Sequence, residues 1–496
     1  MISFVILYSK MSSFPLLYPE EEPKGVQFVQ RIRFAVPSLN TYMQMQSRSY
    51  KLKSLTAVRQ FAMTILVASA VTPVFYGQGT DSQVLRATAY DSHFPAAAKP
   101  GESFNGIGVS SNGTIYYVIS SDKYNIPGQM YSFNPKTKAI THIDDLNDAV
   151  GQGKIKAVAQ GKSHVNFVEA NGKLYFSTHL GYYNNTGGVE RTAAAPHGYL
   201  PYLGGHFLSY DLGTGKFTNL AIAPGGQGII ALNMDVRRGR LYGITWPAGD
   251  FLRYDLKTKN LKNLGTAFHG GELGKLGSTY RAICRRIVID PTDGSAYFTT
   301  GDGAIHRYRY DTDSIDVVAG VSLKKDYFGS FNPAEKGMAY NWRAAVWVPS
   351  EHAIYGVNGR SGYLFRFDPR VPSVEVLKRL TSEPAKKAGM FDPTEYGYLG
   401  LALGADGHTL YYLTGALLSG NKGGVKAQPD QEEGTHLITY DVSNGKYVDH
   451  GQILLNDGQS IRPPQSLVIG LDGTLYTLPY VMRGGKEGID LISFHP

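Results

Sequence analysis

The 496-residue sequence has one cysteine and three tryptophans, and it lacks several motifs on which enzyme chemistry often depends. With only Cys284, no intramolecular disulfide can form, and the apolar flanks of this residue predict a packed core thiol rather than a nucleophile. The sequence contains no P-loop, no pair of CxxC motifs, no Ser nucleophile elbow and no GxGxxG in a βαβ context. Chemistries that need those motifs are therefore not indicated.

The sequence is instead rich in a repeated pattern of turns and strands. Residues 162–178 hold two apolar runs joined by Asn171-Gly172, and Asn-Gly between such runs predicts a β-hairpin. A turn followed by a small or apolar residue and Tyr recurs seven times, at intervals of 55 to 67 residues, and an aromatic third strand follows each copy. The recurring dipeptides are Ile115-Tyr116, Leu174-Tyr175, Leu241-Tyr242, Ala296-Tyr297, Ile354-Tyr355, Leu410-Tyr411 and Leu475-Tyr476. About four strands per repeat, with no helical pattern between repeats, predict a β-propeller.

The two ends of the repeat region predict how the ring closes. The seventh repeat stops after its third strand at Phe494, so its outermost strand must come from elsewhere. The strand-like segment 83–89 precedes the first repeat and can complete the seventh blade, which would pair two edges that are otherwise exposed. The predicted fold class is all-β: a seven-bladed β-propeller over residues 80–496, closed by an N-terminal strand.

The first 79 residues differ from the rest. Lys51, Lys53 and Arg59 precede the apolar run 61–67 and the small residues 68–70, which is the order of a secretory signal peptide. The apolar run is too short for a membrane-spanning helix, which needs about 20 residues. Because the signal lies far from Met1, we interpret residues 1–79 as a mis-started leader plus a signal peptide, with Met43 or Met45 as the better start. The predicted location is secreted or periplasmic, without stable membrane insertion after cleavage.

Removal of the leader changes the charge balance. Residues 1–79 hold eight Lys and Arg against three Asp and Glu, so 41 basic and 38 acidic residues remain and the net charge falls from +8 to +3. The sequence therefore does not predict a nucleic-acid partner.

Functional residues are expected on one face of the propeller. Loops that enter the innermost strands and loops that leave the second strands emerge on the same side, around the mouth of the central channel. The residues at the entries are Asn105, His164, Asn233, Tyr280, Arg281, Trp342, Arg343, Tyr396, Arg462 and Gln465, and those at the exits are His179, Trp246, Asp302, Asn358 and Tyr480. Acidic residues are sparse in this set, which argues against glycoside hydrolysis because that reaction generally uses two placed carboxylates.

Loop lengths indicate the same face. The second-strand Tyr and the third-strand aromatic are 12 residues apart in the third and fifth repeats, but 35 apart in the second and 29 apart in the sixth. The insertion of the second repeat, residues 179–206, contains three His and four Tyr. Long loops on a rigid scaffold are common places for binding and catalysis.

His, Tyr and Arg on one face suit abstraction of a proton next to a carboxylate. Arg or His neutralises the acid, His or Tyr takes the α-proton, and a second His or Tyr protonates the leaving oxygen. This chemistry is β-elimination of a polysaccharide that contains uronic acid. His164 and His179 flank one hairpin and are expected side by side, each near the ordinary His pKa of about 6.5. The catalytic candidates are His164, His179 and Tyr199, and the substrate-binding candidates are Asn233, Trp246, Arg281, Arg343, Tyr202 and His206.

The predicted propeller, the pair His164 and His179, and the segment Pro201 to Asp211 (PYLGGHFLSYD) resemble propeller-fold polysaccharide lyases, most closely the ulvan lyases and more distantly the oligogalacturonate lyases. The resemblance implies a lyase acting on an anionic, ulvan-like polysaccharide with His and Tyr as acid and base and no required cofactor. The oligogalacturonate lyases imply the alternative of a divalent metal held by several His. A non-catalytic propeller that binds carbohydrate or protein, a lactonase-like metal hydrolase and a purely structural interaction module also stay open.

Overall fold

The computed structural model describes residues 84–94, 106–359, 361–387, 400–414 and 434–496. The predicted leader, Asn105, Tyr396 and residues 415–433 of the sixth-repeat insertion lie outside the described residues. The described strands form small antiparallel sheets, as the repeat pattern predicted, and the fold is all-β and propeller-like. None of the helices in the described part of the chain is long and apolar enough to cross a membrane.

Five four-stranded sheets follow one another along the chain. The first consists of β2 (Ile107–Val109), β3 (Ile115–Ile119), β4 (Gln129–Asn134) and β5 (Ala139–Asp145), and the second of β6 (Val168–Ala170), β7 (Lys173–Ser177), β10 (His206–Asp211) and β11 (Phe217–Ile222). The third consists of β12 (Gly228–Asp235), β13 (Arg240–Trp246), β14 (Asp250–Asp255) and β15 (Asn260–Thr266), and the fourth of β16 (Val288–Ile289), β17 (Ala296–Thr299), β18 (Ala304–Arg309) and β19 (Ser314–Ser322). The fifth consists of β20 (Trp342–Val348), β21 (Ala353–Asn358), β22 (Tyr363–Asp368) and β23 (Ser373–Arg379).

The remaining large sheet has eight strands, in the order β24-β25-β26-β27-β1-β32-β29-β28. Its strands are β24 (Leu401–Leu403), β25 (Thr409–Leu413), β26 (His436–Asp441), β27 (Tyr447–Leu455), β1 (Val84–Tyr90), β32 (Leu491–Phe494), β29 (Leu475–Thr477) and β28 (Val468–Ile469). The N-terminal strand β1 pairs antiparallel with β32 at residues 88–90 and parallel with β27 at residues 84–87. This strand therefore joins two sets of four strands, whereas the sequence predicted that it would complete only the last set.

The short helices and two hairpins lie between these strands. The helices are α1 (Leu146–Ala149), α2 (Glu383–Lys387) and the 3-10 turns η1 (Pro224–Gly226), η2 (Gly271–Leu273) and η3 (Asp326–Phe328). The hairpins are β8 (Tyr183–Thr186) with β9 (Val189–Thr192), and β30 (Tyr480–Arg483) with β31 (Lys486–Ile489). Each hairpin follows the second strand of its repeat.

The seven recurring dipeptides all lie on the second strands, which are β3, β7, β13, β17, β21, β25 and β29. Successive side chains of a strand point to opposite faces of its sheet, so the apolar residue and the Tyr enter packing layers on the two sides. Between the third and fourth sheets, for example, the rings of Tyr242 and Tyr308 lie 4.9 Å apart and those of Phe251 and Phe298 lie 5.1 Å apart. The repeat thus supplies the aromatic layer between neighbouring sheets.

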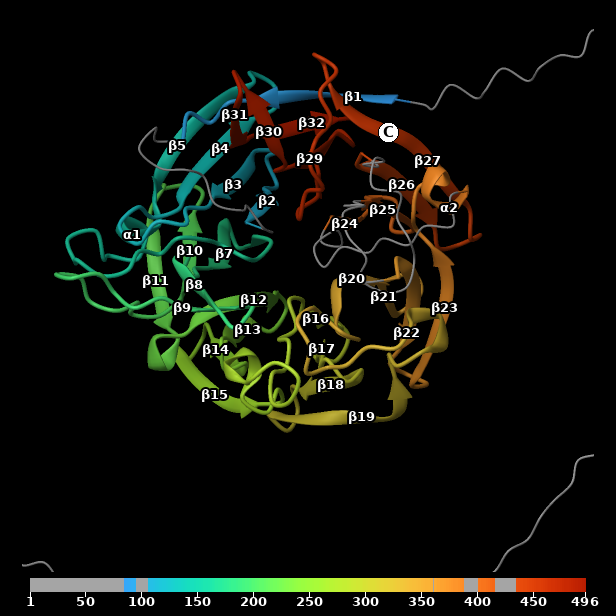
Figure 1. Cartoon of the computed structure of the whole chain (residues 1–496), viewed down its shortest axis with the longest axis horizontal. Helices are drawn as coiled ribbons and strands as arrows, with labels where there is room; N and C mark the ends of the chain where they lie inside the picture. Colours follow the sequence, from blue (N-terminus) through green and yellow to red (C-terminus); the bar gives the residue numbers. More distant parts are fainter. Residues whose placement is uncertain (1–83, 95–105, 360, 388–399, 415–433) are drawn as a thin grey trace, which may run out of the picture. The chain divides into compact units, whose positions relative to one another are not determined.

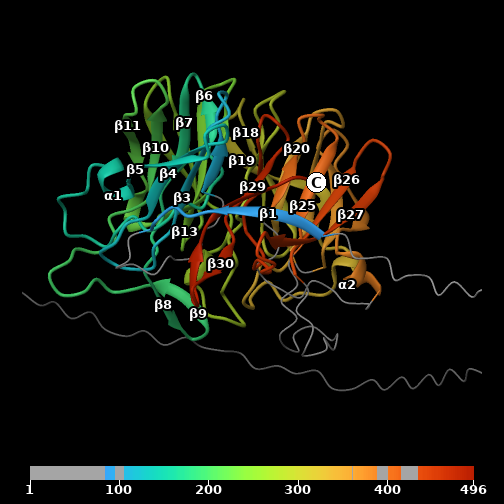
Figure 2. The ribbon, with the colours of Figure 1, turned by 90° about the horizontal axis from the view of Figure 1, so that it is seen from above.

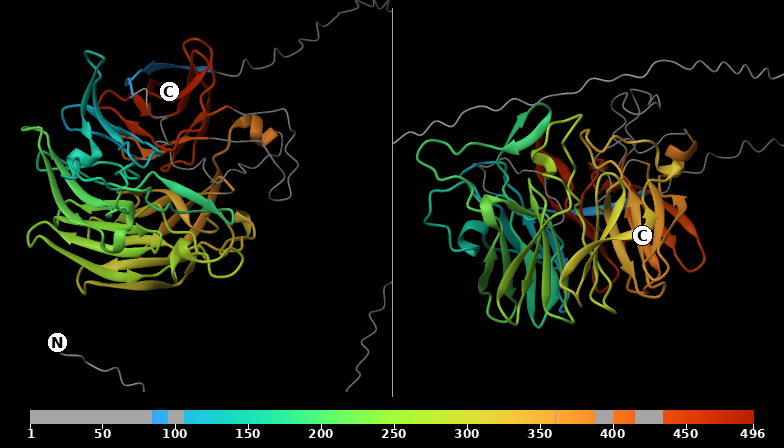
Figure 3. Two further views of the ribbon diagram at one scale, coloured as in Figure 1. Left: turned by 60° about the vertical axis from the view of Figure 1, so that its left-hand side comes forward. Right: turned by 90° about the horizontal axis from the view of Figure 1, so that it is seen from below.

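The sheets of this compact unit, residues 75–496, follow one another in a ring with the first strands on the inside (Figure 1). Contacts between the first strands of neighbouring sheets link β12 with β16, β16 with β20, β20 with β24, and β28 with β2, and β12 also contacts β7, the second strand of the preceding sheet. Seen from the side, the hairpin β8–β9 and helix α2 lie on the face opposite the turn that follows β6 (Figure 2). Figure 3 shows the β8–β9 hairpin projecting beyond the sheets.

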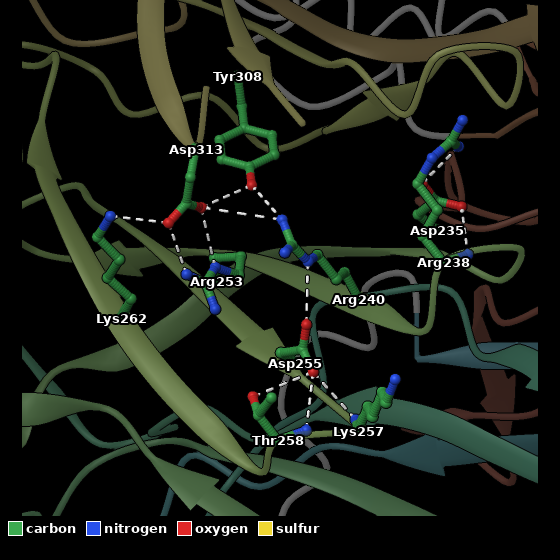
Figure 4. A network of polar contacts seen from close by, with 10 residues as sticks. All are labelled: Asp235, Arg238, Arg240, Arg253, Asp255, Lys257, Thr258, Lys262, Tyr308 and Asp313. Atoms are coloured by element: carbon green, nitrogen blue, oxygen red, sulfur yellow. Dashed lines mark hydrogen bonds and ion pairs between the residues drawn. The ribbon is translucent and has the colours of Figure 1, made fainter. Parts of the chain in front are cut away.

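A cluster of charged residues on the third and fourth sheets joins their outer strands (Figure 4). The carboxylate of Asp313, in the turn before β19, accepts hydrogen bonds from Arg253 at 2.7 Å, from Lys262 at 2.8 Å and from the Tyr308 hydroxyl at 2.7 Å. Arg240 on β13 also donates to the Tyr308 hydroxyl, at 2.7 Å. Burial raises the pKa of Asp313, but these donors outweigh that effect and hold the pKa well below its ordinary value. The cluster fixes one sheet against the next.

Candidate active site

The hairpin β6–β7 brings two histidines together. Its turn has Asn171 at φ +51° and Gly172 at φ +69°, the left-handed pair that a tight two-residue hairpin needs. Only residues 168–170 form its first strand, yet Lys162 and His179 exchange backbone hydrogen bonds of 2.9 and 2.8 Å further along. The imidazole rings of His164 and His179 therefore lie with their centroids 5.0 Å apart and their planes perpendicular. The predicted juxtaposition of these two side chains is present.

Both histidines line a cavity of about 80 Å³ at the inner ends of the second, third, fourth and fifth sheets. The walls come from three kinds of segment: entries to first strands, exits from second strands, and the insertion of the second repeat. The principal lining residues are Lys162, His164, His179, Tyr183, Glu190, Trp246, Glu272, Tyr280, Arg285, Met338 and Arg343. The cavity therefore lies on the face where the sequence analysis expected functional residues.

The two imidazoles are held in the neutral form. Burial lowers the pKa of His164 well below its ordinary value, with further contributions from His179 and Lys162. Burial likewise lowers the pKa of His179, followed by the charges of Lys162 and Arg285. Neither ring nitrogen of His179 has a hydrogen-bond partner among the described residues, and the side chain is fully buried. The sequence-based expectation of a His pKa near 6.5 does not hold here, because both imidazoles are buried and have cationic neighbours.

Four cationic side chains line the cavity: Lys162, Arg285, Lys336 and Arg343. The Lys162 ammonium lies 4.5 Å from the ring centroid of Tyr183, and Arg343 lines the wall with 5% of its surface exposed. Arg285 pairs with Glu272 at 2.8 Å, so its charge is offset within the wall. With the carboxylates of Glu190 and Glu272 as the acidic groups of the lining, these four cations give it a net positive charge.

Glu272 organises one wall of the cavity. Its carboxylate accepts hydrogen bonds from the Trp246 indole at 2.7 Å and from the Ile283 backbone at 2.9 Å, besides the Arg285 pair. Burial raises the pKa of Glu272, but the Arg285 charge and these donors outweigh burial and hold the pKa below its ordinary value. Glu272 is thus an ionised residue that fixes both Trp246 and Arg285.

The second-repeat insertion contributes Tyr183, whose ring centroid lies 5.3 Å from that of Trp246 and 6.1 Å from that of His179. Burial raises the pKa of Tyr183 well above 10, as does the neighbouring Glu190, so the hydroxyl stays protonated. The β8–β9 hairpin is attached to the opposite wall because Arg191 donates to the backbone carbonyls of Glu272 and, at 2.7 Å, Gly274.

Of the other predicted site residues, Trp246 and Arg343 line the cavity, whereas Tyr199, Asn233 and Arg281 do not. The Tyr199 ring packs edge-on against Tyr124 with centroids 5.0 Å apart. Asn233 donates to the backbone carbonyl of Ile287 at 2.9 Å. Arg281 donates to the backbone carbonyl of Ser278 at 2.8 Å, and it is exposed to an intermediate degree.

Tyr202 and His206 belong to a separate buried network under the insertion. The Tyr202 hydroxyl donates to the Gln160 side chain at 2.7 Å, and the Gln160 amide reaches Gln152 at 3.1 Å. His206 lies 2.9 Å from both Gln152 and Asn219 through its two ring nitrogens. These contacts satisfy both side chains inside the protein, so they anchor the base of the insertion.

Sequence reasoning missed Lys162, Tyr183, Glu272 and Arg285. Tyr183 was visible within the insertion, but nothing in the pattern distinguished it from the other Tyr residues there. Lys162 had a clear signal because it faces His179 across the predicted hairpin. Cys284 is buried, and burial raises the pKa of its thiol, as expected of a core thiol.

Among the described residues, no group of three or more His, Cys, Asp or Glu side chains is placed to hold a metal ion. The prediction that no cofactor is required stays a prediction.

No protein-family model and no curated protein matches this chain. Among solved structures, the extracellular domain of a one component system from B. thetaiotaomicron is similar with a TM-score of 0.45 and 12% identity over 83% of this chain, which spans 40% of that one. A chain of the mitotic checkpoint complex is similar with a TM-score of 0.45 and 10% identity, covering 88% of this chain and 99% of that one. Likenesses at this level carry no argument about activity, and the resemblance to ulvan lyases stays a prediction.

Proposed function

We propose that this protein is an exported polysaccharide lyase that cleaves a uronate-containing, ulvan-like polysaccharide by β-elimination. The observation that supports the proposal best is the pair of neutral imidazoles, His164 and His179, in one cavity with Lys162 and Arg343. A cation beside the uronate carboxylate and an uncharged base beside the adjacent carbon are the two groups that this reaction needs.

The reaction moves one proton to the enzyme and returns one to the leaving group. Lys162 and Arg343 hold the carboxylate and stabilise the negative charge that develops when one imidazole of the pair takes the α-proton. The bond from the β-carbon to the glycosidic oxygen then breaks and a carbon–carbon double bond forms in the uronate ring. Tyr183 keeps its proton because burial raises its pKa, and its hydroxyl donates to the Leu180 carbonyl at 2.8 Å; during the reaction it transfers that proton to the leaving oxygen. We assign this role to Tyr183 in place of Tyr199 because Tyr183 lines the cavity.

The test is to mix the protein with ulvan, pectate, alginate or glucuronan and to follow the ultraviolet absorbance of the unsaturated uronate product. His164→Ala and His179→Ala are each expected to lower turnover by at least about a hundredfold, the usual contribution of a positioned acid or base. His269→Asn is the matched control, because His269 is exposed and does not line the cavity. Near-full activity in both His variants, or loss of activity in the control to the same extent, would overturn the assignment.

A non-catalytic carbohydrate-binding propeller is the second candidate, and the small volume of the cavity favours it. At about 80 Å³ the cavity is smaller than the roughly 300 Å³ of an ordinary small-molecule site, so only the carboxylate side of one sugar ring could enter. Saturable binding of a polysaccharide with no unsaturated product, under conditions where the protein is folded, identifies this candidate. Loss of activity with chelators, together with stoichiometric metal in the protein, identifies a metal-dependent lyase instead.

For the architecture, we propose seven blades. This interpretation divides the eight-stranded sheet into β24 to β27 and the set β28, β29, β32 and β1, with β1 as the outermost strand of the last blade. The secretory leader belongs to the same proposal, and its test is whether the exported protein begins near residue 80.

A further inference from the structure

A second cavity, of about 310 Å³, lies further along the inner strands from the candidate active site. Its walls come from β28 and from β2, β20 and β24, which Figure 1 shows on the inside of the ring, and from the segments just before β6 and β16. The walls are almost entirely apolar, with Val346, Leu403 and Ile469 as examples. The two polar side chains in the lining are Asn166 and Arg286. We call this space the channel cavity.

Arg286 brings a positive charge into the channel cavity, and none of the described residues that line this cavity is a carboxylate. Its neighbour Arg285 faces the candidate active site and pairs with Glu272, whereas Arg286 forms no ion pair with any described residue. Its Nη1 donates to the Asn166 side-chain oxygen at 2.6 Å, and its Nε is buried with no hydrogen-bond partner. Burial lowers the pKa of Arg286 to about 10, so the guanidinium is still charged at neutral pH.

The backbone of Arg286 is anchored in the wall of the cavity. Its carbonyl accepts hydrogen bonds from the Trp342 indole at 2.8 Å and from the Cys284 thiol at 3.2 Å, and both of these side chains are fully buried. Arg286 is partly exposed, its Nε is buried, and no carboxylate among the described residues lies beside it, so a negatively charged partner would stabilise it. The anchored backbone and the absence of a carboxylate beside Arg286 among the described residues together indicate a position that can take an anion.

We propose that the channel cavity binds a small organic monocarboxylate, with the carboxylate on Arg286 and Asn166 and the apolar body against the inner strands. One guanidinium supplies one positive charge, which matches a monoanion better than sulfate or phosphate. The apolar walls match a hydrocarbon or aromatic body, and 310 Å³ is within the ordinary range for a small-molecule site. This proposal does not rest on lyase activity, because the lining of the channel cavity shares no residue with that of the candidate active site.

Benzoate is the probe for this site, with benzamide as the uncharged comparator of the same shape and sulfate as the anion without an apolar body. Titration calorimetry on the full-length protein is expected to show one benzoate per chain, with binding of benzamide and of sulfate weaker by at least about tenfold. Absence of benzoate binding up to millimolar concentration overturns the proposal. If benzamide binds as tightly as benzoate, the charge does not contribute to binding. If sulfate binds as tightly as benzoate, the apolar walls do not contribute. Either result overturns the proposal.

Two variants locate the binding. Arg286→Met keeps the apolar stem of the side chain and removes the charge, and it is expected to weaken benzoate binding by at least about tenfold without lowering the unfolding midpoint of the ligand-free protein. Arg343→Met changes a cation of the candidate active site and is expected to bind benzoate as the wild type does. If Arg343→Met weakens benzoate binding and Arg286→Met does not, benzoate binds in the candidate active site and the proposal is overturned.

Val346→Phe fills the channel cavity without touching Arg286 and is expected to lose benzoate binding too. It decides the matter if Arg286→Met does not fold, since retained binding in a folded Val346→Phe protein contradicts a site in the channel cavity.

Discussion

Replacement of His179 by Asn should make the protein less sensitive to mild acid. In the folded protein burial and the charges of Lys162 and Arg285 lower the pKa of His179, whereas in the unfolded chain the pKa returns to about 6.5. Below that pH the unfolded chain binds a proton that the folded protein does not. Stability must therefore fall as the pH falls from about 6.5 toward the lower folded value, and a variant without the imidazole lacks this loss.

While the imidazole of the folded protein stays neutral, the pKa of His179 in the unfolded chain alone sets how much the free energy of unfolding falls. Between about pH 7.5 and about pH 5.5 one such His lowers the free energy of unfolding by at most about 1.4 kcal/mol, and the slope approaches about 1.4 kcal/mol per pH unit at lower pH. Other groups titrate in this range as well, including Asp490, whose pKa burial raises to about 6. The quantity to compare is therefore the difference between the wild type and His179→Asn at each pH, in which groups that do not interact with His179 cancel; His164, whose pKa His179 helps to lower, is the exception.

Equilibrium unfolding in urea at about pH 7.5, 6.5 and 5.5 measures this difference. The wild type is expected to lose stability relative to His179→Asn by about 1 kcal/mol over the range. His269→Asn, at an exposed position, is the control and should follow the wild type. Parallel pH profiles for the wild type and His179→Asn, or an NMR titration of the His179 ring with a midpoint near 6.5 in the folded protein, would refute the reasoning.

The remaining predictions concern the walls of the cavity and the closing strand. Lys162→Gln removes a charge that lowers the pKa of both imidazoles, so the acid limb of the pH profile of lyase activity should move to higher pH. Glu272→Gln leaves Arg285 buried without its partner and should lower the free energy of unfolding by about 3 to 5 kcal/mol in urea titrations. Arg191→Ala detaches the β8–β9 hairpin and should raise the KM for polysaccharide more than it lowers kcat, which steady-state kinetics will measure. Deletion of residues 1–79 should leave thermal stability intact, whereas deletion through residue 95 removes β1 and should lower the Tm and promote aggregation; equal behaviour of the two truncations contradicts closure by β1.

The sequence determined the parts of this protein that depend on local periodicity. The Asn171-Gly172 turn has the left-handed backbone that its residue types favour, and the recurring Tyr dipeptides mark the second strands because strand periodicity sends one residue to each packing layer. The approach of His164 and His179 followed from the same rule, since two residues that flank a hairpin must lie near each other at its open end. These predictions needed no knowledge of contacts between sheets.

The tertiary structure decided which members of each loop face the cavity. Arg281 and Arg285 lie four residues apart between η2 and β16, where the chain has no regular period, so only the packing of Glu272 selects Arg285 for the inner wall. Tyr183 reaches the cavity and Tyr199 does not, because the path of the insertion depends on contacts with other sheets. The low pKa values of the two imidazoles have the same origin: burial and charge neighbours come from residues far apart in the sequence, and no local pattern encodes them.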